Sequence, residues 1–158
     1  TLKNERDRLL TLFIIGFMAA GKTQLAKELA QKLKLPYLDS DTELEKQEGM
    51  SISTIFYTKN ESYFRILEKQ WIDKLDDKPA VISCGGGLPC FNDLLLKKKT
   101  KGKIIFLDTP IDLILQRLQN DQNRPLVRDK TKEEVLKIYQ ARTIYYQMAD
   151  ERMVLEKK

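Results

Sequence analysis

The feature that most constrains the fold is an eight-residue segment that directly follows a run of apolar residues. Residues 16–23 read Gly-Phe-Met-Ala-Ala-Gly-Lys-Thr and fit the pattern G-x-x-x-x-G-K-[ST]. The apolar run Leu12–Ile15 precedes the segment, and leucines four residues apart follow it, which predicts a buried strand, a loop and a helix over 23–33. A loop of this kind directs backbone N–H groups and a helix N-terminus toward an anion. The segment therefore predicts a phosphate-binding loop.

Each fixed position of the loop has a chemical reason. Gly16 and Gly21 allow backbone angles that turn N–H groups toward an anion. We expect Lys22 to reach the β- and γ-phosphates of ATP and Thr23 to supply a hydroxyl group to Mg²⁺. The alternative is an ordinary strand–turn–helix in which Gly-Lys-Thr is incidental. The predicted ATP-binding set of this segment is Gly16, Ala19, Ala20, Gly21, Lys22, Thr23 and Gln24.

Strand and helix patterns alternate along the whole chain. Strands are predicted at 12–15, 36–38, 80–84, 103–107 and 152–155, with helices at 43–48, after the Asn60 cap, after Pro110, and from Thr131 to about Ala149. This alternation predicts an α/β fold with a five-stranded parallel sheet covered by helices on both faces. Ligands of such sheets bind at the carboxyl ends of the strands. The loop, two aspartates and a triple glycine all follow strand ends, so we expect them to meet in one crevice.

Asp39 and Asp41 follow the second strand, while the third strand ends without a carboxylate. If the chain stays extended there, both aspartate side chains point to the same side. Asp39 is then the best candidate to support Mg²⁺, and Asp41 can accept a hydroxyl proton from the phosphoryl acceptor. The alternative for Asp41 is to cap a helix that begins near Thr42.

Gly85-Gly86-Gly87 and two arginines predict an acceptor site. Three consecutive glycines are expected where a ligand packs against the backbone, although a tight turn is the alternative. Arg142 interrupts a predicted inward stripe of apolar side chains and needs an anionic partner, either an internal carboxylate or a ligand carboxylate. Arg65 has Glu68 one turn away to orient it. Two arginine forks suit a planar carboxylate. The stripe comprises Val135, Ile138, Tyr145 and Ala149.

A long polar stretch, 120–131, is predicted to be a lid. Arg124 precedes Pro125 and could neutralise charge as the γ-phosphoryl group moves. Arg117, on the preceding helix, could stack on a base or could simply face solvent. Arg128 is expected at the surface.

Composition excludes several classes of chemistry. The 158 residues contain no histidine, which rules out Ser-His-Asp catalysis, and the two cysteines, Cys84 and Cys90, lack zinc-site spacing. The net charge is +5, but the dense basic run at Lys97–Lys99 and Lys101 has no interleaved aromatic residues and is expected on a solvated helix end. We expect no nucleic-acid partner, no membrane span, a cytoplasmic location, a monomer, and one domain over 1–158.

Taken in order, these motifs closely resemble shikimate kinase. The resemblance rests on the loop at 16–23, Leu38-Asp39-Ser40-Asp41, Phe64-Arg65 with Ile55-Phe56, Glu61 and Glu68, the triple glycine, Arg124-Pro125-Leu126, and Arg142 with Tyr145 and Ala149. It spans residues 12–155. Two positions depart from the family: Ala19 and Asn60 stand where glycine is frequent, and we expect Ala19 not to need a positive φ.

The resemblance implies a nucleoside-monophosphate-kinase-like three-layer α/β/α fold and transfer of the ATP γ-phosphoryl group to the 3-hydroxyl of shikimate, in aromatic amino-acid (chorismate) biosynthesis. It implies Mg²⁺ held by Thr23 and supported by Asp39, with Lys22, Asp41 and Arg124 as catalytic residues. Shikimate would lie against helices within 41–75, and Arg117 near adenine. Another small-molecule kinase, for example for gluconate, and a non-catalytic nucleotide-binding module are the alternatives. The implied shikimate-binding residues are Asp41, Arg65, Gly85, Gly86, Gly87 and Arg142.

Overall fold

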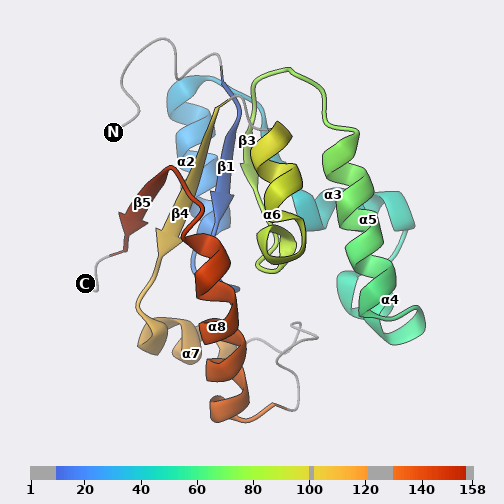
Figure 1. Cartoon of the computed structure of the whole chain (residues 1–158), viewed down its shortest axis with the longest axis vertical. Coiled ribbons are helices and arrows are strands. Elements are labelled where there is room, and N and C mark those ends of the chain that lie inside the picture. The colour runs from blue at the N-terminus through green and yellow to red at the C-terminus, as the bar shows by residue number, and fades with distance from the viewer. Residues whose placement is uncertain (1–9, 100–101, 121–129, 156–158) are drawn as a thin grey trace.

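A twisted sheet of five parallel strands forms the centre of the molecule (Figure 1). The computed structural model describes residues 10–99, 102–120 and 130–155. The strand order is β2-β3-β1-β4-β5. All five strands were predicted, because buried parallel strands read as short apolar runs between turns. The strands are β1 (Leu12–Ile15), β2 (Tyr37–Asp39), β3 (Val81–Ser83), β4 (Lys103–Asp108) and β5 (Glu151–Val154).

Helices cover both faces of the sheet, which confirms the predicted three-layer arrangement. Helix α2 (Lys22–Leu33) packs on one face against Leu12, Ile14 and their neighbours. The opposite face, which carries Phe13 and Ile15, packs against apolar side chains of the other helices. Alternate residues of β1 therefore serve two separate cores. The helices on that opposite side are α6 (Leu88–Lys99), α7 (Ile111–Gln119) and α8 (Lys132–Tyr146).

Three helices between β2 and β3 form a unit with a small core of its own at one side of the sheet (Figure 1). They are α3 (Ser40–Glu48), α4 (Ile52–Thr58) and α5 (Glu61–Asp73), and their buried side chains include Leu44, Ile55 and Phe64. Helix α4 is a single short helix that Ser51 caps, and the periodicity of the sequence did not predict it. The long α5 was predicted, and Asn60 caps it as expected by accepting a hydrogen bond from Tyr63 N.

Two predicted helix ends are corrected by the structure. Helix α3 begins at Ser40, three residues before the predicted start, because Asp39 rather than a later residue caps it. Helix α8 ends at Tyr146 instead of Ala149, and its C-cap is Gln147. The Thr131–Glu134 capping box that was predicted to open α8 is present. Helix α6 ends at Lys99, so Lys97–Lys99 stand at a helix end as expected, whereas Lys101 lies outside the described residues.

The carboxyl ends of three strands lie at one level. Asp39 pairs with Ser83, and Ser83 pairs with Ile14. The chain leaves β1 toward β2 on one side, whereas the segment after β3 crosses β1 to reach β4, which makes the β1–β3 boundary the point where such sheets bind ligands. The phosphate loop and the triple glycine therefore flank the same crevice.

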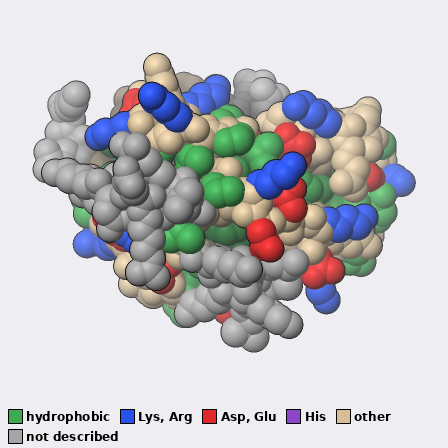
Figure 2. Space-filling view, turned by 90° about the horizontal axis from the view of Figure 1, so that it is seen from above, with side chains coloured by type: hydrophobic (Ala, Val, Ile, Leu, Met, Phe, Trp, Pro, Cys, Tyr) green, Lys and Arg blue, Asp and Glu red, His purple; other side chains and the backbone are tan. Residues whose placement is uncertain are grey.

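No described helix combines the length and apolar character that crossing a membrane requires. Figure 2 views the molecule from above, the end of the sheet opposite the crevice, and there basic and acidic side chains are interspersed.

Candidate active site

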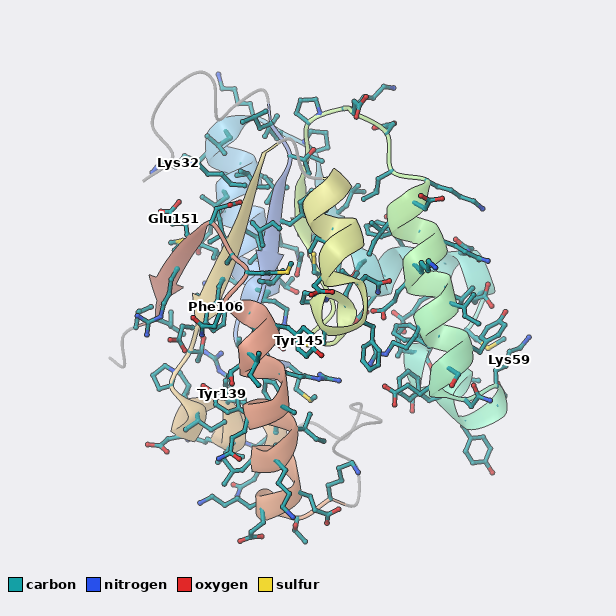
Figure 3. All side chains as sticks on the ribbon, in the orientation of Figure 1. Lys32, Lys59, Phe106, Tyr139, Tyr145 and Glu151 are labelled. Carbon is teal, nitrogen blue, oxygen red and sulfur yellow. The ribbon has the colours of Figure 1, made fainter. Side chains whose placement is uncertain are left out.

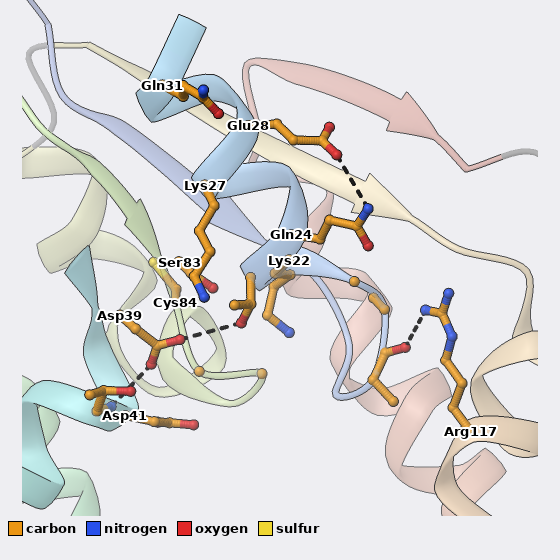
Figure 4. Close-up of a pocket in the computed structure, with 17 residues that line it drawn as sticks. Lys22, Gln24, Lys27, Glu28, Gln31, Asp39, Asp41, Ser83, Cys84 and Arg117 are labelled. Atoms are coloured by element: carbon orange, nitrogen blue, oxygen red, sulfur yellow. Dashed lines mark hydrogen bonds between the residues drawn. The ribbon is translucent and has the colours of Figure 1, made fainter. Parts of the chain in front are cut away.

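A cavity of about 720 Å³ lies at the carboxyl ends of β1, β2 and β3 (Figure 4). Its lining includes residues 19–23 of the phosphate loop, both predicted aspartates, two of the three glycines and Arg117. Its volume falls within the range of small-ligand sites, roughly 300–1,000 Å³. The cavity thus joins residues that the sequence placed after three different strands.

The phosphate loop has its carbonyl groups engaged by donors. The buried Lys22 side chain curls back along the loop, and its Nζ donates to the carbonyl oxygens of Gly16 and Phe17, each at 2.8 Å. Arg117 Nη1 donates to the carbonyl oxygen of Ala19 at 2.8 Å. Because these carbonyl oxygens already accept hydrogen bonds, the loop can present its N–H groups to an anion. The helix that starts at Lys22 adds the positive end of its dipole.

Backbone angles of the loop confirm one glycine prediction and correct another expectation. Gly21 has φ of 101°, a left-handed angle that glycine adopts without strain. Ala19 also has a positive φ, 62°, contrary to the expectation that this position needs none. The loop conformation itself imposes the angle, so the methyl group of Ala19 adds strain of about 1–2 kcal/mol relative to glycine. Asn60, the other departure from the family, likewise has φ of 99°.

Asp39 lies between the loop helix and α3. Its Oδ1 accepts a hydrogen bond from Thr42 N at 3.0 Å, and its Oδ2 accepts one from Thr23 Oγ1 at 3.4 Å. The predicted extended path from Asp39 to Asp41 is wrong, because Asp39 is the N-cap of α3 and Asp41 lies in its first turn. The alternative prediction, that Asp41 caps this helix, is also wrong, because the capping residue is Asp39. Both aspartates nevertheless line the cavity.

Thr23 and Asp39 fit the requirements of a Mg²⁺ site. Magnesium prefers hard oxygen ligands and usually takes only one or two from the protein, with phosphate and water supplying the others. The Thr23–Asp39 contact brings a hydroxyl and a carboxylate together beside the loop (Figure 4). The described residues contain no cluster of three or more His, Cys, Asp or Glu side chains suited to a metal.

Each of the three consecutive glycines faces a different predicted site residue. A Cβ atom built on Gly85 would lie 2.5 Å from Asp41 Oδ1, and one on Gly87 would lie 2.6 Å from Arg65 Nη2. A Cβ on Gly86 would lie 3.1 Å from Met18 N and 3.4 Å from Arg142 Nη1. None of the three glycines is among those with positive φ, so close approach rather than an unusual angle explains them. The triple glycine therefore gathers Asp41, Arg142 and Arg65 along one short backbone segment.

Arg65 is held by two carboxylates of its own helix. Its Nη1 donates to Glu68 Oε1 at 2.6 Å, and its Nε and Nη2 donate to Glu61 Oε2 at 3.2 and 3.0 Å. The ring of Phe91 lies 4.3 Å from the guanidinium carbon. These contacts confirm the predicted orientation by Glu68 and add Glu61 to it. Glu68 is fully buried, and this burial raises its pKa to about 7 despite the opposing effect of Arg65.

Arg142 is only 7% exposed and forms no ion pair with any carboxylate of the described residues. Its neighbours are the ring of Phe17, 5.9 Å from the guanidinium carbon, and the hydroxyl group of Tyr146. Of the two partners that the sequence left open, an internal carboxylate is not found within ion-pair distance among the described residues, although the buried Glu68 is near enough to interact with Arg142 electrostatically. A buried guanidinium in this situation suits a ligand anion.

The tyrosine of the α8 stripe is Tyr146 and not Tyr145. Tyr145 is 40% exposed, whereas Tyr146 is fully buried and its hydroxyl donates to the carbonyl oxygen of Gly86 at 2.7 Å. Figure 3 places Phe106 of β4 beside the end of α8, and its ring stacks on Tyr146 with centroids 5.2 Å apart. Spacing alone does not decide between the two tyrosines, because Tyr145 and Tyr146 stand three and four positions after Arg142 and both positions lie about one helical turn away.

The remaining site predictions concern the cysteines and the lid. Cys84 and Cys90 are free thiols, as expected, and burial raises the pKa of Cys90 to about 11, which makes it unreactive near neutral pH. Arg124, Arg128 and nearly all of the predicted lid lie outside the described residues. Ser40 was not predicted at all: its buried hydroxyl accepts a hydrogen bond from Gly85 N at 2.8 Å, and so ties the triple glycine to the start of α3.

Known proteins are similar to this chain over most of its length. The family model described as "Shikimate kinase" matches residues 18–158. The chain is 40% identical over 148 residues to shikimate kinase of Persephonella marina, covering 93% of this chain and 90% of that protein. It is 36% identical over 149 residues to shikimate kinase of Aquifex aeolicus, covering 94% and 88%.

A solved structure is also similar throughout. Shikimate kinase from Acinetobacter baumannii, in complex with shikimate, superposes with a TM-score of 0.85 at 31% identity and covers 96% of this chain and 87% of that chain.

Proposed function

The chain belongs to the shikimate kinase family, and we propose that it transfers the γ-phosphoryl group of ATP to the 3-hydroxyl of shikimate through the residues described above. The observation that carries the acceptor assignment is the buried Arg142, which has no carboxylate within ion-pair distance among the described residues and lies against Gly86. The shikimate-bound relative supports this choice of acid. The reaction would belong to aromatic amino-acid biosynthesis.

The phosphate loop holds ATP in this proposal. Backbone N–H groups of the loop and the N-terminus of α2 bind the β- and γ-phosphates, and Lys22 exchanges its bonds to the Gly16 and Phe17 carbonyls for phosphate oxygens. Thr23 and Asp39 hold Mg²⁺, which would neutralise phosphate charge. Arg117 lies at the rim of the cavity, on the side proposed for the base.

The acceptor side binds shikimate by its carboxylate and aligns one hydroxyl. Arg142 pairs with the carboxylate, and Arg65, held in place by Glu61 and Glu68, provides the second guanidinium. Because residues 85–87 have no side chains, the ring of shikimate can approach their backbone. Asp41, which lines the cavity beside the loop, accepts the hydroxyl proton as the oxygen bonds to the γ-phosphorus and ADP departs with the bridging oxygen. The catalytic role of Arg124 stays a prediction, as do the monomer and the cytoplasmic location.

Replacement of Arg142 tests the acceptor assignment. Arg142→Ala should raise the KM for shikimate by on the order of 100-fold, because a buried charge-assisted pair is lost. The KM for ATP should change little. Initial rates at varied shikimate and ATP would measure both values, with circular dichroism as a check of folding.

Arg152→Ala is the matched control. Arg152 is an exposed arginine on β5 that pairs with Asp108, away from the acceptor site. This variant should leave both KM values near those of the wild type. An unchanged KM for shikimate in a folded Arg142→Ala variant would return Arg142 to a structural role.

A further inference from the structure

Thr109, the residue after β4, makes a long-range contact with the phosphate loop that the proposed mechanism does not use. Its side chain is 2% exposed, and Oγ1 donates to the carbonyl oxygen of Ala20 at 2.6 Å. This is a short hydrogen bond for a neutral hydroxyl group. Thr109 and Ala20 are 89 positions apart in the sequence, so the bond ties the β4–α7 connection directly to the loop.

A second donor from the same region engages the preceding carbonyl. Arg117 of α7 donates from Nη1 to the carbonyl oxygen of Ala19 at 2.8 Å. Two consecutive peptide groups of the loop, after Ala19 and after Ala20, are thus fixed from one side. The orientation of the first of these peptide groups determines ψ of Ala19.

Ala19 is the residue whose backbone needs such support. Its φ of 62° lies in the left-handed region, which a residue with a Cβ atom adopts rarely outside a constraining environment. Residues in such regions persist only where the surrounding structure over-determines them. The bond from Arg117 fixes the peptide group that follows Ala19, and the bond from Thr109 fixes the next peptide group, so the backbone on the C-terminal side of Ala19 is held in place by both.

We propose that Thr109 is a positioning residue for the phosphate loop: together with Arg117 it holds Ala19 in the left-handed conformation in which the loop binds the phosphates of ATP. Thr109 does not touch the phosphates itself. The proposal rests on the proposed function only in that the loop binds ATP. It accounts for how this chain keeps the loop conformation with an alanine at position 19.

A double-mutant cycle in the full chain tests this coupling. The measurement is the Kd of a non-hydrolysable ATP analogue with Mg²⁺, by calorimetry, for the wild type, Thr109→Val, Ala19→Gly and the double variant. Thr109→Val should weaken binding about five- to tenfold, the size expected for one lost hydrogen bond. In the Ala19→Gly background the same change should cost about twofold or less, because glycine adopts the left-handed angle without a constraint.

Two control variants separate the hydroxyl bond from general damage. Thr109→Ser retains the donor and should bind the analogue within about twofold of the wild type. Thr11→Val removes a threonine hydroxyl that donates to the carbonyl oxygen of Lys78, at the opposite end of the sheet, and should leave the Kd unchanged. If Thr109→Val does not fold, Thr109→Ala removes the same hydroxyl and replaces it in the cycle.

Two results would overturn the proposal. One is an unchanged Kd in Thr109→Val. The other is an equal loss of affinity in the wild-type and Ala19→Gly backgrounds, which would make the two positions independent. Failure of the proposed function is recognised separately, because a chain that binds the analogue but does not phosphorylate shikimate would leave the cycle interpretable.

Discussion

Glu68 is a carboxylate buried in the interior of the protein. Its side chain is 0% exposed, Oε1 binds Arg65, and Oε2 has no hydrogen-bond partner among the residues that the structure describes. Burial raises its folded-state pKa to about 7, above the ordinary value of 4.5. The folded protein therefore holds this proton more tightly than the unfolded chain. The stabilising contribution is complete below pH 4.5 and is lost as the pH rises through about 7.

Glu68→Gln removes this titration and measures its contribution. The free energy of unfolding of the wild type, relative to the variant, should fall by on the order of 1–3 kcal/mol between about pH 5 and pH 8. Denaturant titrations of both proteins at the two pH values would test this. A difference that stays constant, or that grows with pH, would contradict the assigned environment of Glu68.

Gly87 tests whether close packing of the triple glycine matters for the acceptor. Gly87→Ala places a methyl group 2.6 Å from Arg65 Nη2, the flexible end of that side chain, which can move aside without disrupting the fold. The KM for shikimate should rise roughly 10- to 100-fold through misplacement of Arg65.

Gly49→Ala is the comparison for Gly87→Ala, with the opposite expectation. No atom of the described part of the chain lies within 4 Å of the added Cβ atom at Gly49, but its φ is 68°. Stability should therefore fall by about 1 kcal/mol while shikimate kinetics stay the same. If Gly87→Ala instead lost stability and kept its KM, the glycine would serve the fold and not the site.

At the scale of elements, the start of α3 serves structure and chemistry together. Asp39 caps the helix through Oδ1 and contacts Thr23 through Oδ2. Asp39→Asn keeps a capping oxygen and removes the charge, whereas Asp39→Ala removes both. We expect Asn to be about as stable as the wild type and Ala to lose about 1 kcal/mol.

The Mg²⁺ concentration for half-maximal rate should rise in both Asp39 variants, because charge near the metal is lost in each. Thermal unfolding and Mg²⁺ titrations of the rate would separate the two roles. If Asp39→Asn kept the wild-type Mg²⁺ requirement, Asp39 would act only as a cap.

Helices and strands were predictable where their buried residues form a regular apolar pattern in the sequence. The five strands and the long helices follow apolar runs and periodic leucines. Helix α4 was missed because it is one short helix whose capping residue, Ser51, precedes no long apolar periodicity. The end of α8 was placed too late because Met148 and Ala149 continue the apolar pattern into the turn.

At the site, residue types were predictable but side-chain directions were less so. The rule that ligands bind at the carboxyl ends of parallel strands correctly predicted that Asp39, Asp41 and the triple glycine lie at one crevice. It did not indicate that Asp39 caps α3 or that Tyr146 rather than Tyr145 faces inward. Those outcomes depend on the residue at which a helix begins and on how the helix is rotated about its axis. The sequence pattern does not define either to within one residue. The positive φ of Ala19 follows from the geometry of the loop, which residue types alone do not determine.

In the whole molecule, two binding regions meet at the carboxyl ends of the central strands. The phosphate loop follows β1, the acceptor residues come from α3, α5 and α8, and the triple glycine after β3 lies between them. Such an arrangement makes ATP turnover depend on the acid, since the γ-phosphoryl group needs an aligned hydroxyl.

The most direct measurement is the product formed by the purified chain from ATP, Mg²⁺ and shikimate, followed by ³¹P nuclear magnetic resonance, with gluconate in place of shikimate as the comparison. The account predicts ADP and a phosphate monoester at the 3-hydroxyl of shikimate, with little ADP formed when shikimate is left out or replaced by gluconate. Equal turnover with gluconate, or ATP binding without any shikimate phosphate, would contradict it.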